Sequence, residues 1–413
     1  MGILVFGLGP LAIAGPGALP FVDVRSDFTL FDPNYAAKHD TLAQRATALK
    51  LRLFTLEQTG HPMVCAHQLL AEVSWRLSST ADWLKIEEQL DQLAELVANP
   101  DTDRTPDPQS PTDGSWGHCL SAWFFRLDTS YNHIADLAAA GEGPPYSPHF
   151  LDRINDPTRL QEYLSGIALS DIAHEGIDHR RELNNALADL MRLILKDEPS
   201  NYHWDGGLKA ELMALILGSL RDPATGFWGE TYRRGNTKVR VQDLGMTFHV
   251  VRYLNGGVPD WPKIIDTLLA IKDLPYPQGW MRGNSYLTHD LYDVVALMHM
   301  GWAHASGVQQ ATMREEIGAM LNWCLANAVR PDGSVVVMAD DDSVEAATYN
   351  AVSFLREVGY FSHAERFWTT QSFPGASNLA LKLRASIKAA LASGAGGEGG
   401  GYYRSALQKL SGD

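Results

Sequence analysis

Cysteine is scarce in this chain, and long apolar runs are scarce as well. The 413 residues include three cysteines, Cys65, Cys119 and Cys324, which lie far apart and in no CxxC spacing. This spacing predicts neither a disulfide framework nor a zinc site held by thiolates, so we expect three small buried side chains. After the N-terminal stretch, no apolar segment is long enough to span a bilayer.

Basic residues are also few relative to acidic ones. Thirty-four lysines and arginines stand against 49 aspartates and glutamates, which gives a net charge of −15. Such a chain is not expected to bind nucleic acid or an anionic membrane surface. We therefore expect a small or neutral partner, unless a local basic patch selects an acidic one.

A metal-binding motif is missing. Residues 174–179 (HEGIDH) resemble HExxH but contain one residue too many. On a helix their two histidines would point about 140° apart, and Gly176 would weaken that helix. We predict a structural loop there, with no metal and no cofactor.

The two ends of the chain differ in composition from the rest. Residues 1–20 are apolar and small, as in a secretory leader, but they lack a basic start and are interrupted by a Gly-Pro-Gly sequence. A cleaved leader would predict a secreted or periplasmic protein, and a retained segment a cytoplasmic one. Residues 393–413 are predicted to form a glycine-rich flexible tail with a short helix. Residues 21–392 are interpreted as a single domain.

What the chain does contain is a repeated helical pattern. Six predicted helices carry a polar residue near their start, and in four of them it directly follows an aromatic residue. The six polar residues are His67, Asn132, Asn185, His249, Asp293 and Asn350. They lie 44 to 65 residues apart, which is the length of one helical hairpin with its loops. This repeat predicts hairpins stacked or arranged in a ring, with the polar groups facing one central cavity.

A glycine turn precedes four of these helices, often directly before an aromatic side chain. The turns are residues 113–117 (DGSWG), 222–229 (DPATGFWG), 278–280 (QGW) and 332–334 (DGS). Their glycines can adopt the positive φ that tight turns require. Strand-like alternation is confined to residues 237–241 and 334–338. We predict an all-α fold, an (α/α)6 barrel or toroid of six helical hairpins with small β-hairpins in its loops.

One hairpin resembles a known family. Residues 222–228 (DPATGFW), followed by residues 234–236 (RGN) and a helix ending near residues 253–256 (YLNG), are similar to the hairpin unit of the six-hairpin glycosidases. The likeness is greatest to the unsaturated uronide hydrolases, whose units carry D-x-x-T-G-L-W. The resemblance covers one hairpin well and a larger part of the chain loosely. It implies the toroid fold and hydrolysis by an aspartate acid/base.

Four carboxyl groups are candidates for this chemistry. Asp293 is the only acidic member of the six polar residues, and Glu230, Asp243 and Asp290 lie in the two loops beside it. Glycoside hydrolysis uses one carboxyl group to protonate the leaving oxygen and usually a second to activate water or attack. We expect Asp293 to be the acid/base, with Glu230 or Asp243 as its partner. Asp243 is placed equally well to cap the following helix.

Aromatic and polar side chains suggest how a sugar would be held. An indole can cover the apolar face of a pyranose, which predicts Trp116, Trp228 and Trp280 at the rim of the cavity. The same three residues could instead wedge between hairpins. The other candidates for substrate binding are Asn132, Asn350, Arg282, Arg234 and Asp290.

One basic stretch contrasts with the acidic total. Residues 232–240 (YRRGNTKVR) contain four cations and no acid. A solvated hairpin would explain this, but the stretch lies between the Trp228 turn and His249, where guanidinium groups could hold a carboxylate. That position favours an acidic sugar as the substrate.

Several functions remain open. The leading interpretation is acid/base hydrolysis of a glycosidic bond in an oligo- or polysaccharide. In a polysaccharide lyase, Asn132 or Asn350 would neutralise a uronate. His249 would then abstract a proton and Tyr292 would donate one. Opposed histidines, His67 and His249, would suit a sugar 2-epimerase, and a terpenoid-cyclase-like protein or a non-catalytic toroidal binding protein are further alternatives.

Overall fold

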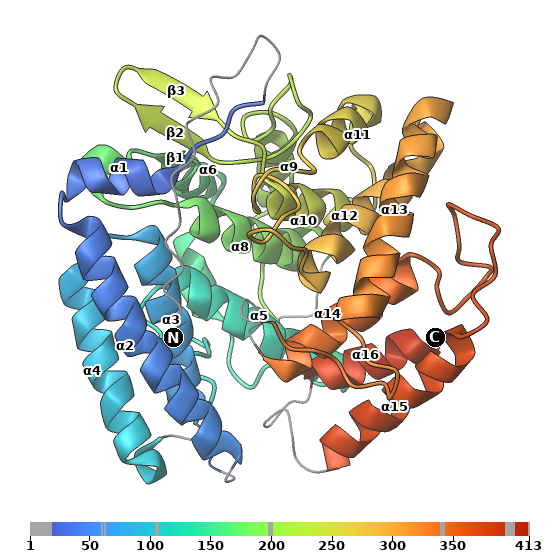
Figure 1. Cartoon of the computed structure of the whole chain (residues 1–413). Coiled ribbons are helices and arrows are strands. Elements are labelled where there is room, and N and C mark those ends of the chain that lie inside the picture. The colour runs from blue at the N-terminus through green and yellow to red at the C-terminus, as the bar shows by residue number, and fades with distance from the viewer. Residues whose placement is uncertain are drawn as a thin grey trace.

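Sixteen α-helices and one small sheet make up the described part of the chain in a computed structural model (Figure 1). The structure describes residues 19–58, 61, 63–103, 107–196, 201–338, 343–392 and 401–411. Nearly all of the predicted leader and the glycine-rich part of the tail lie outside these residues. The prediction of a mostly helical protein is confirmed, and the short helix expected in the tail is present.

The helices range from four residues in α7 to 24 residues in α2. In chain order the helices are α1 (Val24–Phe31), α2 (Tyr35–Gln58), α3 (Val64–Ser79), α4 (Trp83–Ala98), α5 (Trp123–Ala139), α6 (Pro157–Ile167), α7 (Ile172–Glu175), α8 (Arg180–Leu190), α9 (Leu208–Leu217), α10 (Leu244–Tyr253), α11 (Trp261–Ala270), α12 (Thr288–Gly301), α13 (Gly307–Asn327), α14 (Val344–Glu357), α15 (Ala376–Ala392) and α16 (Gly401–Ser411). The shorter turns are η1 (Pro100–Thr102), η2 (His149–Arg153), the π-helical η3 (Met191–Leu195) and η4 (Trp302–His304). Among the described residues, no helix combines the length and apolar character needed to cross a bilayer.

The first long helices form a core of their own. α2, α3 and α4 pack together, in blue to cyan in Figure 1, around buried leucines such as Leu53 and Leu90. Asp82 caps the start of α4, because its Oδ1 accepts a hydrogen bond from the backbone N–H of Lys85 at 3.2 Å.

Six later helices pack as successive neighbours. α5 contacts α8, α8 contacts α10, α10 contacts α12, α12 contacts α14, and α14 contacts α16. The helices that alternate with them along the chain include α9, α11, α13 and α15. One large apolar core, which includes Trp75 and Leu410, contains residues of all six helices. A ring of hairpins requires such a succession, whereas closure of the ring stays a prediction.

The predicted polar positions fall on this succession with one exception. Five of them lie on α5, α8, α10, α12 and α14 in turn: Asn132, Asn185, His249, Asp293 and Asn350. His67 lies instead on α3, which packs against α2 and α4, and its ring stacks on Phe54 at 6.4 Å. The sixth place in the succession belongs to α16, which carries none of the six residues. The sequence pattern did not single out α16, because the glycine-rich residues before it predict a flexible tail rather than a further hairpin.

A three-stranded sheet lies beside these helices. β1 (Leu169–Ser170) runs parallel to β2 (Thr231–Arg234), and β2 pairs antiparallel with β3 (Thr237–Arg240). The small hairpin predicted at residues 237–241 is therefore confirmed. The sheet is short, and α7 packs on β2 while α1 packs on α7.

The predicted glycine turns are confirmed in three of four cases. Gly114, Gly226 and Gly333 have φ values of 71°, 76° and 85°. Gly279 does not have a positive φ; a Cβ there would lie 2.3 Å from the Leu274 carbonyl oxygen, so close packing explains this glycine instead. The strand-like residues 334–338 contribute only one isolated bridge among the described residues.

Candidate active site

An ion pair joins the start of α8 to the start of α10. Asp243 is 1% exposed and caps α10, because its Oδ1 accepts a hydrogen bond from the backbone N–H of Met246 at 2.8 Å. The Arg180 guanidinium donates to both carboxylate oxygens, with Nη2 at 3.1 Å from Oδ1. The capping role considered for Asp243 is therefore confirmed. Both of its oxygens are engaged, so Asp243 is poorly placed to attack a substrate.

A second ion pair lies in the first turn of α12. Asp290 is fully buried, and Arg282 Nε donates to its Oδ2 at 2.8 Å. Nδ1 of His289 lies 3.0 Å from Asp290 Oδ1. Asp290 and Arg282, which were predicted separately as substrate ligands, thus bind each other and orient His289. His289 was missed, although its position four residues before Asp293 places both side chains on one helical face.

Asp293 lies one turn further along α12. It is 1% exposed, and its Oδ2 has no hydrogen-bond partner among the described residues. Burial, assisted by the negative charges of Asp290 and Asp243, raises the pKa of Asp293 to about 7, although His289 and Arg252 act in the opposite direction. Asp293 is therefore a carboxyl group that can hold a proton near neutral pH.

His289 carries a positive charge beside Asp293. Burial lowers the pKa of His289, but the charges of Asp293 and Asp290 outweigh that effect and raise it to about 9. Its side chain is nevertheless 41% exposed, and that of Arg282 is 32% exposed. Water therefore reaches His289 and Arg282 beside the buried Asp290 and Asp293. We call the surroundings of His289, Asp293, Arg282 and Tyr276 the α12 recess.

Tyr276 lies against the arginines of both ion pairs, Arg282 and Arg180. Its ring centroid is 4.1 Å from the Arg282 guanidinium and 5.7 Å from that of Arg180. A Cβ on Gly245 would lie 2.7 Å from the Tyr276 hydroxyl, so only glycine lets α10 approach this closely. Burial raises the pKa of Tyr276, which keeps the phenol protonated. Tyr276 was missed because nothing in its local sequence distinguishes it from any other tyrosine in a loop.

His249 lies in the second turn of α10 and is held by an amide. Its Nδ1 is 3.2 Å from Oδ1 of Asn184, and its ring stacks on Tyr253 at 5.9 Å. Burial lowers the pKa of His249 well below its ordinary value, and the charges of Arg192 and His289 lower it further. The imidazole is therefore neutral. Asn184 makes this contact from α8, although the sequence pattern singled out its neighbour Asn185.

Glu230 is fully buried and directly precedes β2 in the chain. Ser170 Oγ donates to its Oε1 at 2.8 Å, and its Oε2 has no partner among the described residues. Burial and the charge of Asp178 raise the pKa of Glu230 well above its ordinary value. Glu230 therefore holds its proton more tightly than an ordinary glutamate. It fits an acid, and not the water-activating base that was one of its two expected roles.

Tyr292 points toward α10 and α16. Its ring lies 5.4 Å from that of Phe248, and Lys409 Nζ is 5.3 Å from its centroid. Burial raises the pKa of Tyr292, so the phenol keeps its proton. Its role as a proton donor stays a prediction.

The two predicted asparagine ligands differ in their surroundings. Asn132 is exposed on α5, whereas the preceding Tyr131 is buried with its ring centroid 4.6 Å from the Arg192 guanidinium. The aromatic residue of this pair therefore takes part in the interior cluster. Asn350 is partly buried on α14. Substrate binding by either asparagine stays a prediction.

The three tryptophans do not line a rim. Trp228 and Trp280 are fully buried, and Trp116 is 5% exposed. Trp228 Nε1 donates to the Ile216 carbonyl oxygen at 2.7 Å, and Trp116 stacks on His133 at 5.1 Å. The expectation of a sugar-binding surface is therefore wrong for these residues. Their large apolar rings are removed from water between the helices, which is the wedge role considered as the alternative.

Arg234 does not reach the α12 recess. Its Nε donates to Asp27 at 3.0 Å, and its Nη2 donates to Ser26 Oγ at 3.0 Å and to the Asp23 carbonyl oxygen at 3.1 Å. The basic residues 232–240 form the β2–β3 hairpin, and Arg234 ties it to α1. The expectation that Arg234 holds a substrate carboxylate is wrong, because its guanidinium is already committed.

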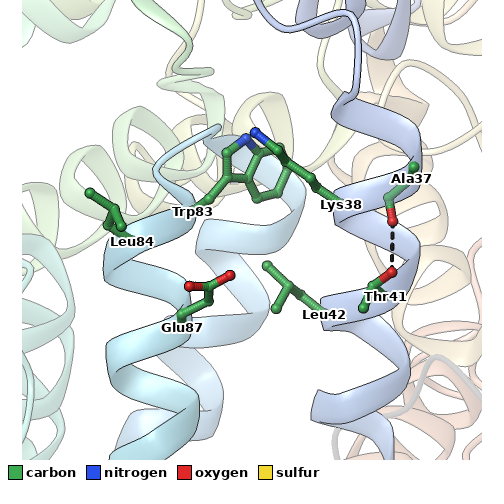
Figure 2. A pocket seen from close by; sticks show the side chains of 7 residues that line it. All are labelled: Ala37, Lys38, Thr41, Leu42, Trp83, Leu84 and Glu87. Atoms are coloured by element: carbon green, nitrogen blue, oxygen red, sulfur yellow. Dashed lines mark hydrogen bonds between the residues drawn. The ribbon is translucent and has the colours of Figure 1, made fainter.

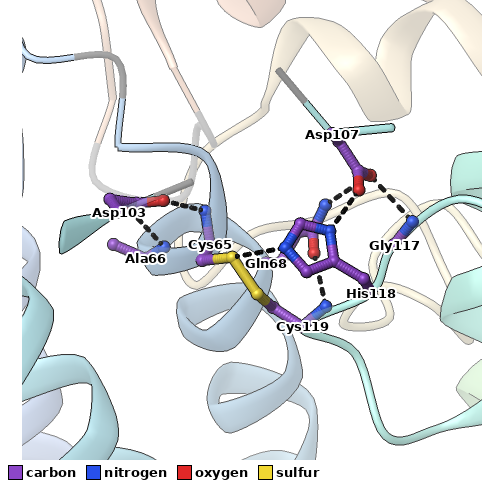
Figure 3. The surroundings of a disulfide bond; sticks show 8 residues. All are labelled: Cys65, Ala66, Gln68, Asp103, Asp107, Gly117, His118 and Cys119. Atoms are coloured by element: carbon purple, nitrogen blue, oxygen red, sulfur yellow. Dashed lines mark hydrogen bonds and ion pairs between the residues drawn. A yellow bond between two sulfur atoms is a disulfide. The ribbon is translucent and has the colours of Figure 1, made fainter. Parts of the chain in front are cut away.

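A disulfide joins the start of α3 to the loop before α5 (Figure 3). It links Cys65 and Cys119, which corrects the expectation that these cysteines are unpaired; Cys324 is buried and free. His118 Nε2 lies 3.3 Å from Cys65 Sγ, and its Nδ1 lies 2.5 Å from Asp107 Oδ1. The two sulfurs and a His118 nitrogen lie within 4.8 Å of one another, which suits a metal ion only if the disulfide is reduced.

An open groove lies between α2 and α4, away from the predicted catalytic residues (Figure 2). It has a volume of about 530 Å³ and is lined by Ala37, Lys38, Thr41, Leu42, Trp83, Leu84 and Glu87. No candidate catalytic residue lines it. The groove is therefore not part of the candidate active site.

Known proteins assign nothing to the α12 recess. The recess itself offers a carboxyl group that holds a proton near neutral pH, a cationic imidazole and a phenol, and the neutral imidazole of His249 is near enough for the charge of His289 to lower its pKa. These groups can donate and accept protons in one place. No protein-family model, curated protein or solved structure matches the chain.

Proposed function

We propose that this protein is a carbohydrate-active enzyme that hydrolyses a glycosidic bond in an oligo- or polysaccharide, with Asp293 as the acid/base. The state of this one side chain supports the proposal most: a buried carboxyl group with a free oxygen and a pKa of about 7. A general acid works best when its pKa lies near the working pH. The cationic His289 beside it would stabilise the carboxylate that remains after proton donation.

A single available carboxyl group suits one class of substrate in particular. Asp243 has both oxygens in an ion pair, and burial raises the pKa of Glu230 well above its ordinary value, so neither is a ready base. An unsaturated uronide needs only one acid/base. Asp293 would protonate its carbon–carbon double bond, and the resulting carboxylate would take a proton from the water that adds to the adjacent carbon. The hydrated product then opens and releases the second sugar.

The resemblance of residues 222–228 to the unsaturated uronide hydrolases agrees with this substrate class. We extend the proposal to the fold, in which α5, α8, α10, α12, α14 and α16 form the inner layer of an (α/α)6 toroid. Their packing as successive neighbours supports this. In such a toroid the starts of α10 and α12 would open on one central cavity.

A polysaccharide lyase is the second candidate, favoured by the neutral state of His249. A neutral imidazole can abstract the proton beside a uronate carboxylate, and Tyr292 or Tyr276 could donate a proton to the leaving oxygen. In this reaction the ring loses a proton and the glycosidic oxygen gains one, which leaves a new carbon–carbon double bond. The two candidates therefore change ultraviolet absorbance in opposite directions.

The test is digestion of a panel of unsaturated uronides, intact uronate-containing glycans and neutral glycans. Loss of ultraviolet absorbance from unsaturated fragments is the result we expect. A gain of absorbance from intact glycans would replace the hydrolase by the lyase. New reducing ends without an absorbance change would mean ordinary hydrolysis by a second group, and no change with any glycan would reject the proposal.

A further inference from the structure

Two cations, one on α10 and one on α16, have no acidic partner among the residues that the structure describes. Arg252 is in the last turn of α10, and Lys409 is in the last turn of α16; both are partly buried. Among the described residues, neither makes an ion pair or a hydrogen bond to a carboxylate, although other partly buried arginines do. Those arginines and their partners are Arg180 with Asp243, Arg192 with Asp189, Arg234 with Asp27 and Arg282 with Asp290.

Aromatic rings surround the two cations instead. Lys409 Nζ lies 5.3 Å from the ring centroids of both Tyr292 and Tyr349. The Arg252 guanidinium lies 5.5 Å from the centroid of Phe248 and 5.8 Å from that of Tyr253. Ring faces attract a cation, but they do not neutralise its charge. The arrangement leaves N–H donors of both cations available to an anion.

The surroundings of Lys409 make its positively charged form less favourable. Burial lowers the pKa of Lys409, and the positive charges of Arg252 and Arg356 lower it further. Tyr349 and the charge of Glu357 act in the opposite direction, and Glu357 Oε1 lies 2.6 Å from His299 Nδ1. Like charges held together in a partly buried place favour binding of an anion between them.

This pair of cations is close to the proposed acid. The positive charge of Arg252 acts on Asp293, and Tyr292, which contacts Lys409, is the neighbour of Asp293 in the chain. An anionic group between Arg252 and Lys409 would thus belong to a molecule that also reaches the α12 recess. The net charge of −15 would otherwise repel an acidic substrate, so such a molecule needs a local cationic site.

We propose that Arg252 and Lys409 bind the carboxylate of a uronate in the substrate, with Tyr292 and Tyr349 as the walls of this site. The proposal rests on the proposed function, because it assigns the residues that would hold the uronate carboxylate in the same enzyme. It replaces the basic hairpin as the reason for an acidic substrate, since Arg234 binds α1. The guanidinium and the ammonium group would each donate charge-assisted hydrogen bonds to the carboxylate.

The test is calorimetric titration of the full chain with sodium D-glucuronate, compared with D-glucose and with sodium sulfate. We expect saturable binding of glucuronate and none of glucose. Lys409→Gln and Arg252→Gln should each weaken that binding by about ten- to a hundredfold, the effect of losing one or two hydrogen bonds to a charged group. Lys388→Gln and Arg404→Gln are matched controls on exposed parts of α15 and α16 and should bind as the unchanged protein does.

Three results would overturn the proposal. They are no binding of glucuronate, equal binding by Lys409→Gln and Arg252→Gln, and binding of sulfate alone. Circular dichroism checks that the variants are folded. If either glutamine variant is unfolded, Lys409→Arg decides the matter, because it keeps the charge and should keep most of the affinity.

Binding and turnover separate the two proposals. Glucuronate binding that depends on Lys409, without cleavage of any glycan, would leave the anion site standing and reject the proposed catalysis. Cleavage of neutral glycans without glucuronate binding would do the reverse.

Discussion

Asp243 and Asp293 are both buried aspartates at the starts of adjacent helices, but their partners differ. Arg180 and the backbone N–H of Met246 satisfy the carboxylate of Asp243. Asp293 has a free oxygen, and burial raises its pKa to about 7. The same residue type is therefore a helix cap in one place and a candidate acid in the other. Sequence spacing nominated both and could not separate them, because the difference comes from a residue 63 positions away from Asp243.

Asp293 should make the stability of the protein depend on pH. Its pKa is raised from 3.8 to about 7 on folding, so the native state binds the proton more tightly and loses stability as pH rises through that interval. The limiting slope is about 1.4 kcal/mol per pH unit. Asp293→Asn should remove this slope between pH 4 and 7, approximately, when urea unfolding is measured across the range. An identical slope in the variant would show that Asp293 is ionised throughout.

Gly245 should be intolerant of a side chain. A Cβ at this position would lie 2.7 Å from the Tyr276 hydroxyl, so Gly245→Ala should displace Tyr276 and destabilise the fold by about 1–3 kcal/mol. Gly166→Ala is the matched control, since a Cβ there meets nothing within 4 Å and the residue lies in α6. The control should be neutral or gain up to about 1 kcal/mol. Equal effects of the two changes in urea unfolding would contradict the close packing at Tyr276.

At the scale of elements, α12 carries most of the candidate site. His289, Asp290 and Asp293 are spaced so that they share one side of its first two turns. Asp290 and Asp293 were predicted, and His289 could have been, because the spacing is local. Arg180 and Tyr276 were not, since they come from α8 and from a loop whose contacts depend on tertiary packing. The tryptophan turns show the same limit: their position was predictable, but whether an indole faces solvent or a neighbouring helix was not.

The disulfide should stabilise the junction of α3 with the loop before α5. The two cysteines are 54 residues apart in the sequence, and the bond closes the loop between them. A double variant, Cys65→Ser with Cys119→Ser, should therefore lose about 2–4 kcal/mol of unfolding free energy. Cys324→Ser is the control for the loss of a cysteine as such, with its buried thiol outside the disulfide. A double variant as stable as the unchanged protein would show that the bond contributes nothing.

At the scale of the whole molecule, the repeat was predictable and its closure was not. Five of the six polar positions lie on helices that pack in succession, because a hairpin repeat leaves a periodic signal in the sequence. The sixth, His67, was assigned to the wrong helix, since α2, α3 and α4 form a separate core that period alone cannot distinguish. The place after α14 belongs to α16, which is near the C-terminal end.

Removing α16 should therefore weaken the whole assembly. Ending the chain after residue 392 would expose the surfaces that pack on Tyr403, Ala406 and Leu410, which are at most 6% exposed. We expect a loss of about 3–6 kcal/mol in urea unfolding, from apolar burial alone. Leu410→Ala should reproduce about 2–4 kcal/mol of it without shortening the chain. Unchanged stability after truncation would mean that α16 is an accessory and not part of the succession.

The central claim is that Asp293 donates a proton to a sugar substrate. The most direct measurement is the initial rate at which an unsaturated uronide disaccharide loses its ultraviolet absorbance, for the unchanged protein, Asp293→Asn and the exposed control Asp136→Asn. We predict turnover that falls above pH 7, approximately, as Asp293 ionises, a loss of about a hundredfold or more in Asp293→Asn, and no loss in Asp136→Asn. Equal rates for Asp293→Asn and the unchanged protein would contradict the claim.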